Sequence, residues 1–207
     1  MKKVKFRFLN IIFVLIIALL SFGFNSFAAL KDDLNIDSCV QLNLKDNCRL
    51  QYLSECKKIL AENEFDNLVN KIYNLTYNLN SSYPDYKKWF FEKLIKNIGN
   101  KKREIIFITD KNNDVIAMSA LKNENNEKKI CTLYIKENFR SLGFGSKLIE
   151  QSFKFLETTK PLITFSEEKL PMFNGFIKKY NWELYEKNDS YGNTYSELCY
   201  NGFLTHH

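Results

Sequence analysis

Two glycines separated by one residue, Gly143 and Gly145, stand where a strand-like pattern gives way to a helical one. The residues before them, Lys129–Ile135, include the β-branched and aromatic residues typical of a strand. After them, Ser146–Thr159 places apolar side chains at three- and four-residue steps, as an amphipathic helix does. Glycine at such a junction lets a ligand approach unpaired backbone amides, whose partial positive charge favours phosphate. The segment therefore predicts a phosphate-binding loop.

Spacing separates three kinds of phosphate-binding loop. A nucleotide P-loop needs four residues between its first glycine and a Gly-Lys-Ser/Thr, a pattern that this segment lacks. A dinucleotide fingerprint needs a third glycine at position 148, where the chain has Leu148. The pattern present is Arg140-Ser-Leu-Gly143-Phe-Gly145, in which Arg140 and nearby Lys147 supply positive charge.

The periodicity of the rest of the chain predicts the order α-α, β-β-β, α, β, α, β-β. Apolar steps from Tyr52 to Leu79 indicate one or two helices, and a further helix is expected from Pro84 to Gly99. Lys122–Lys128 is expected to be a polar loop, and residues 30–50 a linker or an edge element. The remaining elements are expected at Glu104–Thr109, Val115–Leu121, Lys129–Ile135, Leu162–Ser166, Trp182–Glu186 and Tyr195–Tyr200 for strands, and at Ser146–Thr159 and Leu170–Tyr180 for helices.

The glycine pattern, the strand ending in Leu133-Tyr-Ile135 and the amphipathic helix together resemble the cofactor motif of GNAT-type N-acetyltransferases. The strand Pro161–Ser166 follows at the expected distance, and the resemblance covers roughly residues 62–202. It implies an α+β fold whose mixed, mostly antiparallel central sheet is flanked by helices. It also implies transfer of an acetyl group from acetyl-coenzyme A to an amine of a small molecule or a protein, by direct attack and without a metal. The alternative is a catalytically inactive acyl-CoA-binding module of the same fold.

The resemblance assigns roles to individual residues. Amides of the loop would hold the cofactor's pyrophosphate, the strand backbone would pair with pantetheine, and an amide near Tyr134 or Ile135 would stabilise the oxyanion. The expected slot for the thioester opens where the strand ending at Ser166 diverges from Lys129–Ile135. The residues expected to bind the cofactor are Leu133, Tyr134, Ile135, Arg140, Ser141, Leu142, Gly143, Phe144, Gly145 and Ser146.

The proton donor is a point where the chain departs from the family pattern. Many relatives carry a tyrosine four residues before a Gly-Phe pair in the last helix, but here Asn181-Trp182 replaces that pair and Ile177 takes the tyrosine's place. Tyr180 lies three residues further on the same helical face and is the first candidate for the catalytic acid. Ser166, at a strand end, is the second.

The N-terminus has the layout of a secretory signal. Four basic residues among the first seven precede the apolar stretch Phe8–Phe24, and Ser26-Phe27-Ala28 offers small residues before a cleavage site. Residues 1–28 are therefore expected to be a signal peptide or an uncleaved membrane anchor that engages the membrane or the export machinery. The protein is then secreted or membrane-anchored, and cytoplasmic if the segment is not functional. Residues 29–61 are expected to be a linker, 62–202 the acetyltransferase domain and 203–207 a tail.

The net charge argues against nucleic-acid binding, and the cysteine spacing argues against a zinc site. The formal net charge is +6, and because four basic residues lie in the N-terminal segment, the remainder is too weakly basic for a nucleic-acid footprint. The only histidines are His206 and His207, and the spacing of Cys39, Cys48 and Cys56 matches no zinc pattern. A disulfide among these three cysteines and reduced thiols both remain open.

Overall fold

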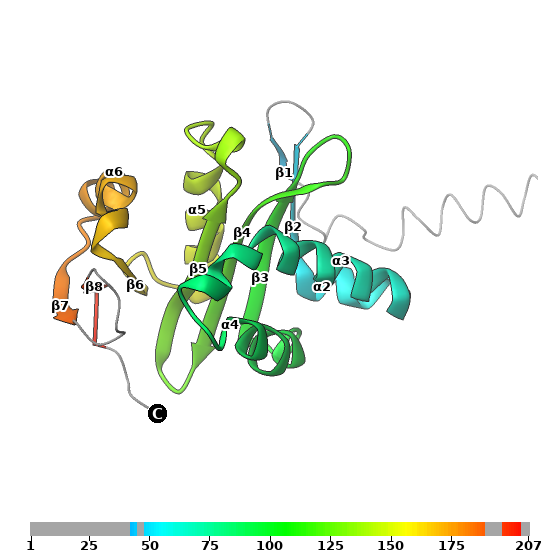
Figure 1. Cartoon of the computed structure of the whole chain (residues 1–207), viewed down its shortest axis with the longest axis horizontal. Helices are drawn as coiled ribbons and strands as arrows, with labels where there is room; N and C mark the ends of the chain where they lie inside the picture. Colours follow the sequence, from blue (N-terminus) through cyan, green and yellow to red (C-terminus); the bar gives the residue numbers. More distant parts are fainter. Residues whose placement is uncertain (1–41, 45–47, 189–195, 204–207) are drawn as a thin grey trace, which may run out of the picture. The chain divides into compact units, whose positions relative to one another are not determined.

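The computed structural model describes residues 42–44, 48–188 and 196–203. The expected signal or anchor at residues 1–28 lies outside them. Within the described ranges the strands form one mixed sheet in the order β1-β2-β3-β4-β5-β6-β8-β7 (Figure 1). Every neighbouring pair is antiparallel except β5 and β6, which run parallel. The strands are β1 (Leu42–Leu44), β2 (Cys48–Tyr52), β3 (Arg103–Thr109), β4 (Val115–Glu124), β5 (Glu127–Ile135), β6 (Leu162–Ser166), β7 (Leu184–Asn188) and β8 (Glu197–Tyr200). This is the mixed, mostly antiparallel sheet that the family resemblance implies.

Helices cover both faces of this sheet (Figure 1). One face carries α2 (Leu53–Ile59), α3 (Glu62–Leu75) and α4 (Tyr86–Lys88), and the other carries α5 (Phe144–Leu156) and α6 (Leu170–Tyr180). Strand alternation divides the core between them, since Ile105 and Phe107 pack beneath α2 to α4 whereas Ile106 and Ile108 pack beneath α5. Short helical turns complete the chain: η3 (Tyr77–Ser81), η4 (Trp89–Leu94), η5 (Ile95–Asn97), η6 (Glu137–Phe139) and η7 (Glu167–Lys169).

Helix α5 confirms the apolar face predicted from its periodicity. Its buried positions include the five that the sequence places inward, namely Leu148, Ile149, Ser152, Phe153 and Leu156. The hydroxyl of Ser152 donates to the carbonyl of Leu148 at 2.7 Å and lies 3.0 Å from the Ser119 hydroxyl of β4. These paired hydroxyls satisfy two polar groups that burial would otherwise penalise, so a serine is tolerated between the helix and the sheet.

The structure differs from the sequence prediction at several element boundaries. Cys48–Tyr52, expected in a linker or edge, pairs with β3 along Ile106–Thr109. Most of the expected polar loop at 122–128 is strand, because Asn125 and Asn126 both adopt positive φ and close a tight hairpin. The helix expected from Pro84 begins at Tyr86 and continues as π and 3-10 turns to Asn97.

Trp182 is the remaining departure. It was expected to begin a strand, but it is buried before β7 with its indole nitrogen donating to the Thr159 carbonyl at 3.1 Å. None of the helices in the described ranges is both long enough and apolar enough to cross a bilayer.

Candidate functional site

Strands β5 and β6 are parallel neighbours for only two residue pairs, Lys129 with Leu162 and Ile130 with Ile163. Beyond them β6 pairs only with β8 among the described strands, through residues 164–166. A bulge in β5 lies at the same level, since Ala120 and Leu121 of β4 face Thr132 and Ile130 and leave Cys131 without an opposite residue. The strand ending at Ser166 therefore diverges from β5, as predicted. We call this divergence the β5–β6 parting.

The register of β5 decides which backbone groups face the parting. The Lys136 amide donates to the Ile116 carbonyl of β4 at 2.8 Å. Because backbone groups alternate sides along a strand, those of Tyr134 also point toward β4, and those of Leu133 and Ile135 point toward the parting. The Ile135 carbonyl accepts a bond from Arg140 Nε at 3.3 Å, which agrees with that direction. Of the three strand residues assigned to the cofactor, two thus present backbone groups to the parting.

The loop between β5 and α5 has the conformation of an anion-binding turn. Ser141 and Gly143 both have positive φ, 62° and 87°, and Gly143 is the N-cap of α5. A glycine has no side chain with which to cap, and no side chain in the described ranges takes its place at this helix end. The first amides of α5 therefore lack the partners that most helix ends acquire from a cap. Successive amides in such a turn form a concavity for phosphate.

Two cations flank the loop in loose ion pairs. Arg140 lies 3.8 Å from Glu137, and Lys147 lies 3.7 Å from Glu150. Exposed pairs at these distances contribute little to stability. Both side chains can therefore turn toward a bound phosphate at small cost.

Gly145 has a packing role that the sequence did not reveal. A β-carbon at this position would lie 3.3 Å from Cζ of Phe176 in α6 and 3.6 Å from Cδ1 of Ile135. A β-carbon at Gly143 would meet no atom within 4 Å. A side chain at Gly145 would therefore disturb the packing of α5 against α6, whereas one at Gly143 would not reach the core.

The structure separates the two candidate proton donors. Ser166 ends β6 at the parting, and because Ile163 and Phe165 pack toward α5, strand alternation puts Ser166 on the opposite face of the sheet. Tyr180 is at the far end of α6, where its ring meets Phe153 edge to face at a centroid distance of 4.8 Å. Phe153 lies eight residues beyond Gly145, about 12 Å along the helix. Tyr180 is therefore not brought to the loop.

The surroundings of Tyr180 are those of a core residue. Its ring also lies against Trp182, with centroids 6.1 Å apart, and both belong to the apolar cluster beneath α5 and α6. Its hydroxyl is buried and makes no hydrogen bond of normal geometry in the described part of the chain, although the ammonium of Lys179 lies 4.8 Å from the centre of its ring. This environment favours packing over proton transfer.

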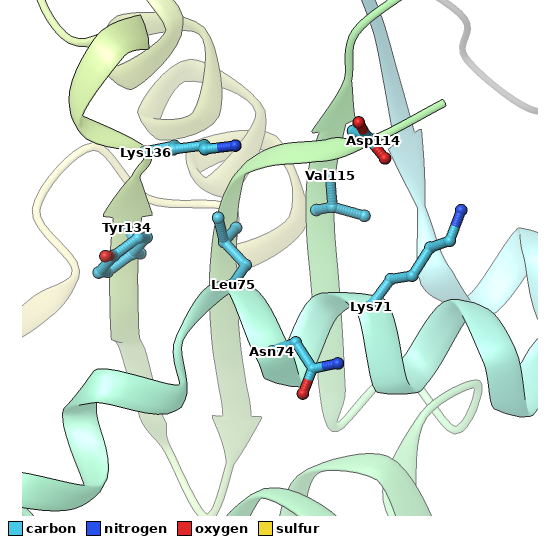
Figure 2. Close-up of a pocket in the computed structure, with 7 residues that line it drawn as sticks. All are labelled: Lys71, Asn74, Leu75, Asp114, Val115, Tyr134 and Lys136. Atoms are coloured by element: carbon cyan, nitrogen blue, oxygen red, sulfur yellow. The ribbon is translucent and has the colours of Figure 1, made fainter. Parts of the chain in front are cut away.

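A pocket of about 470 Å³ lies on the α3 side of the sheet. Its lining residues are Lys71, Asn74, Leu75, Asp114, Val115, Tyr134 and Lys136, drawn in Figure 2. They come from the end of α3, the turn between β3 and β4, and the end of β5. Tyr134 and Ile135 are consecutive in β5, with Tyr134 packing on the α3 side and Ile135 on the α5 side. The pocket and the loop thus meet the same end of β5 from opposite faces.

Residues 67–163 match the model of the Acetyltransferase (GNAT) family. The chain carries a GNAT acetyltransferase domain. Enzymes of this family use acetyl-coenzyme A as a co-substrate. The matched span runs from α3 to β6, so it contains both the loop between β5 and α5 and all the residues that line the pocket. No curated protein matches the sequence.

Two solved structures share the fold of this domain. A protein assigned to the GNAT family from Desulfovibrio desulfuricans is 9% identical with a TM-score of 0.54, over 74% of this chain and 96% of that one. A protein assigned as a phosphinothricin N-acetyltransferase is 16% identical with a TM-score of 0.50, over the same shares of the two chains. Both likenesses show the fold.

The chain spans less than two thirds of nourseothricin acetyltransferase. The match covers 65% of that structure and 49% of this chain, at 10% identity and a TM-score of 0.44. Within the described residues of the GNAT domain, no group of three or more His, Cys, Asp or Glu side chains is placed to hold a metal ion.

The pocket was not predicted from the sequence. Lys71, Asp114 and Lys136 are far apart along the chain, and each reads alone as an exposed charge on a helix or in a loop. Tyr134 was singled out for its backbone, whereas in the GNAT domain its side chain lines the pocket. The alternation of side chains along β5 could have predicted this position, because the neighbour of a residue that faces the loop must face the other side of the sheet.

Proposed function

We propose that this domain transfers an acetyl group from acetyl-coenzyme A to an amine by direct attack. The observation that carries the proposal is the uncapped, glycine-led start of α5 beside the β5–β6 parting, in a chain with a GNAT family match. The comparisons lend no support to the alternative of a catalytically inactive acyl-CoA-binding module. The acceptor is a small molecule or a protein.

Binding of the co-substrate divides between the loop and β5. The amides at the start of α5 hold the pyrophosphate, and Arg140 and Lys147 add compensating charge. Leu133 and Ile135 offer their backbone groups to the pantetheine amides, since these groups face the parting. The loop residues in this proposal are Arg140, Ser141, Leu142, Gly143, Phe144, Gly145 and Ser146.

Acetyl-coenzyme A supplies an acetyl thioester. The amine attacks its carbonyl carbon, so that a C–N bond forms and the C–S bond breaks. The Ile135 amide faces the parting and stabilises the negative charge that develops on the carbonyl oxygen. Ser166 stands on the other strand of the parting and is our first candidate to protonate the departing thiolate. The proton lost by the amine passes to water. Tyr180 is not assigned this role, because its hydroxyl is enclosed at the far end of α6.

The pocket is the proposed acceptor site. It meets β5 at Tyr134 from the face opposite the phosphate-binding loop. The co-substrate then enters the parting from one face of the sheet, and the amine reaches its thioester from the other face. Such opposite approach allows both substrates to be bound together, which direct transfer requires.

Domain limits and cellular location are proposed as follows. The catalytic domain expected at 62–202 also includes β2 and α2, because β2 adds to the sheet and Leu53 and Cys56 are buried. Residues 1–28 are proposed as an export signal on sequence grounds alone. A secreted or membrane-anchored protein follows from that segment, and a cytoplasmic one if the segment is not functional.

The test is acetyl transfer by the full chain. Acetyl-coenzyme A and a panel of amines are supplied together, and released thiol is followed with a chromogenic disulfide. Release that needs both the protein and an amine is the expected result. Binding of acetyl-coenzyme A without thiol release from any amine would contradict transfer and favour the inactive module.

A further inference from the structure

The pocket beside β5 carries two lysines on different walls. Lys71 comes from the last turns of α3, and Lys136 follows the last residue of β5. Figure 2 shows the two lysine side chains on opposite sides of the pocket, with Leu75 and Val115 between them in this view. Apolar side chains thus line the middle of the pocket, and positive charges stand at its sides.

Neither lysine has a counter-ion in the part of the chain that the structure describes. In the described ranges no ion pair or side-chain hydrogen bond involves Lys71 or Lys136, whereas Lys122 is paired with Glu127 at 2.9 Å and Lys187 with Glu167 at 2.8 Å. Other described lysines are also unpaired, so the lack of a partner is not by itself unusual. Lys71 and Lys136 differ in that both line the same pocket, where they leave a positive site open to a ligand.

Asp114 contributes the one negative charge of the pocket lining. Its place is fixed by the turn between β3 and β4, where Asp110 Oδ1 accepts bonds from the amides of Asn112 and Asp114, both at 2.9 Å. Two lysines and one aspartate give the lining a formal charge of +1. An amine must be neutral when it attacks, so an acceptor that balances this charge carries one negative group elsewhere.

We propose that the acceptor is a small amine that also bears an anionic group, a carboxylate or a phosphate, which Lys71 and Lys136 bind. The inference rests on the proposed function and names the class of its second substrate. The volume of about 470 Å³ lies within the range of pockets for small molecules. Selection by charge is expected to weaken with salt, because both lysines are exposed.

The experiment compares amines matched in size. The probes are γ-aminobutyrate against butylamine, and O-phosphoethanolamine against ethanolamine. Binding to the full chain is measured by saturation-transfer NMR, with and without coenzyme A, and kcat/KM is measured for each probe. We expect the anionic member of at least one pair to bind about tenfold more tightly. The two pairs show whether carboxylate or phosphate is preferred.

Variants then locate the preference. Lys71→Gln combined with Lys136→Gln is expected to remove it while affinity for the neutral amines and for acetyl-coenzyme A stays unchanged. Lys154→Gln is the matched control, an exposed lysine in α5 on the other face of the sheet. Equal binding of charged and neutral probes, or a preference that persists in the double variant, overturns the inference. Failure to bind acetyl-coenzyme A overturns the proposed function instead, and because probe binding is measured without coenzyme A too, the two failures are distinguishable.

Discussion

Ile135 at the end of β5 and Gly145 in the first turn of α5 are in near contact, with only 3.6 Å between Cδ1 of Ile135 and a β-carbon placed on Gly145. The strand assigned to pantetheine and the loop assigned to pyrophosphate are therefore fixed against each other. Cζ of Phe176 in α6 lies 3.3 Å from the same β-carbon. A substitution at this junction is expected to affect both the stability of the fold and the binding of the co-substrate.

Gly145→Val is expected to destabilise the protein, because its side chain must displace Phe176 or Ile135. Overpacking of this kind costs about 1–3 kcal/mol. Gly175→Val is the matched control, since a β-carbon at that glycine of α6 meets no atom within 4 Å. The free energy of unfolding from urea titration is the measurement. Equal stability of the two variants would contradict the packing role of Gly145.

Ser166→Ala is expected to impair catalysis, and Tyr180→Phe is expected to leave it unchanged. Loss of a proton donor reduces turnover by roughly 10²-fold or more, which we predict for Ser166→Ala with affinity for acetyl-coenzyme A intact. Tyr180→Phe is expected to keep turnover and stability, since it removes a buried hydroxyl that makes no hydrogen bond of normal geometry in the described residues and keeps the ring beneath Lys179. Steady-state kinetics with the best amine of the panel decides. A large loss in Tyr180→Phe alone would restore the acid predicted from the sequence.

Local patterns in the sequence were sufficient for the elements that carry the loop. The buried face of α5 and the hairpin of β3 and β4 depend on periodicity and spacing within short segments, whereas the divergence of Ser166 from β5 was expected from the family resemblance. Gly143 was also predictable, because its role requires only a left-handed backbone and open space. Such features are encoded within a few residues of each other.

Features that depend on distant contacts were not predictable. Strand β2 is recognisable only through its pairing with β3, more than fifty residues away. The contact of Gly145 with Phe176 and the enclosure of Tyr180 by Phe153 and Trp182 depend on how α6 packs against α5. Asn125 and Asn126 were a local signal for a turn. Because the residues on both sides are also polar, the sequence predicted a longer loop there instead.

Glu104 is expected to make stability depend on pH. Its carboxylate is buried in β3, where it accepts bonds from the Ser54 amide at 3.1 Å and from the Ile105 amide at 2.9 Å. Desolvation raises the pKa of Glu104 above its ordinary value of 4.5, although the bonds from Ser54 and Ile105 oppose the shift. The folded state then holds the proton more tightly than the unfolded state. The contribution of Glu104 to stability is therefore full below pH 4.5 and falls as pH rises through the raised pKa.

Glu104→Gln isolates this effect. The free energy of unfolding of the variant minus that of the wild type is expected to increase as pH rises from 4.5 toward neutrality. Thermal or urea unfolding at a series of pH values gives the difference. A difference that is flat, or that decreases with pH, would show that the hydrogen bonds outweigh desolvation.

The N-terminal prediction is tested by expression in a secreting cell. Cleavage after Ala28 is expected, because Ser26 and Ala28 are the small residues that a signal peptidase needs three and one positions before the cut. N-terminal sequencing of the soluble fraction should then begin at Ala29. An intact Met1 in a salt-washed membrane pellet would indicate an anchor, and a full-length protein in the cytosol would exclude both an export signal and an anchor.

Titration of the full chain with acetyl-coenzyme A, followed by isothermal calorimetry, tests the central claim most directly. The wild type is expected to bind one equivalent. Gly143→Val is expected to lose that binding while keeping its fold by circular dichroism, because its side chain strains the left-handed backbone of the loop without meeting a core atom. Unchanged affinity in Gly143→Val, or no binding by the wild type, would contradict the account.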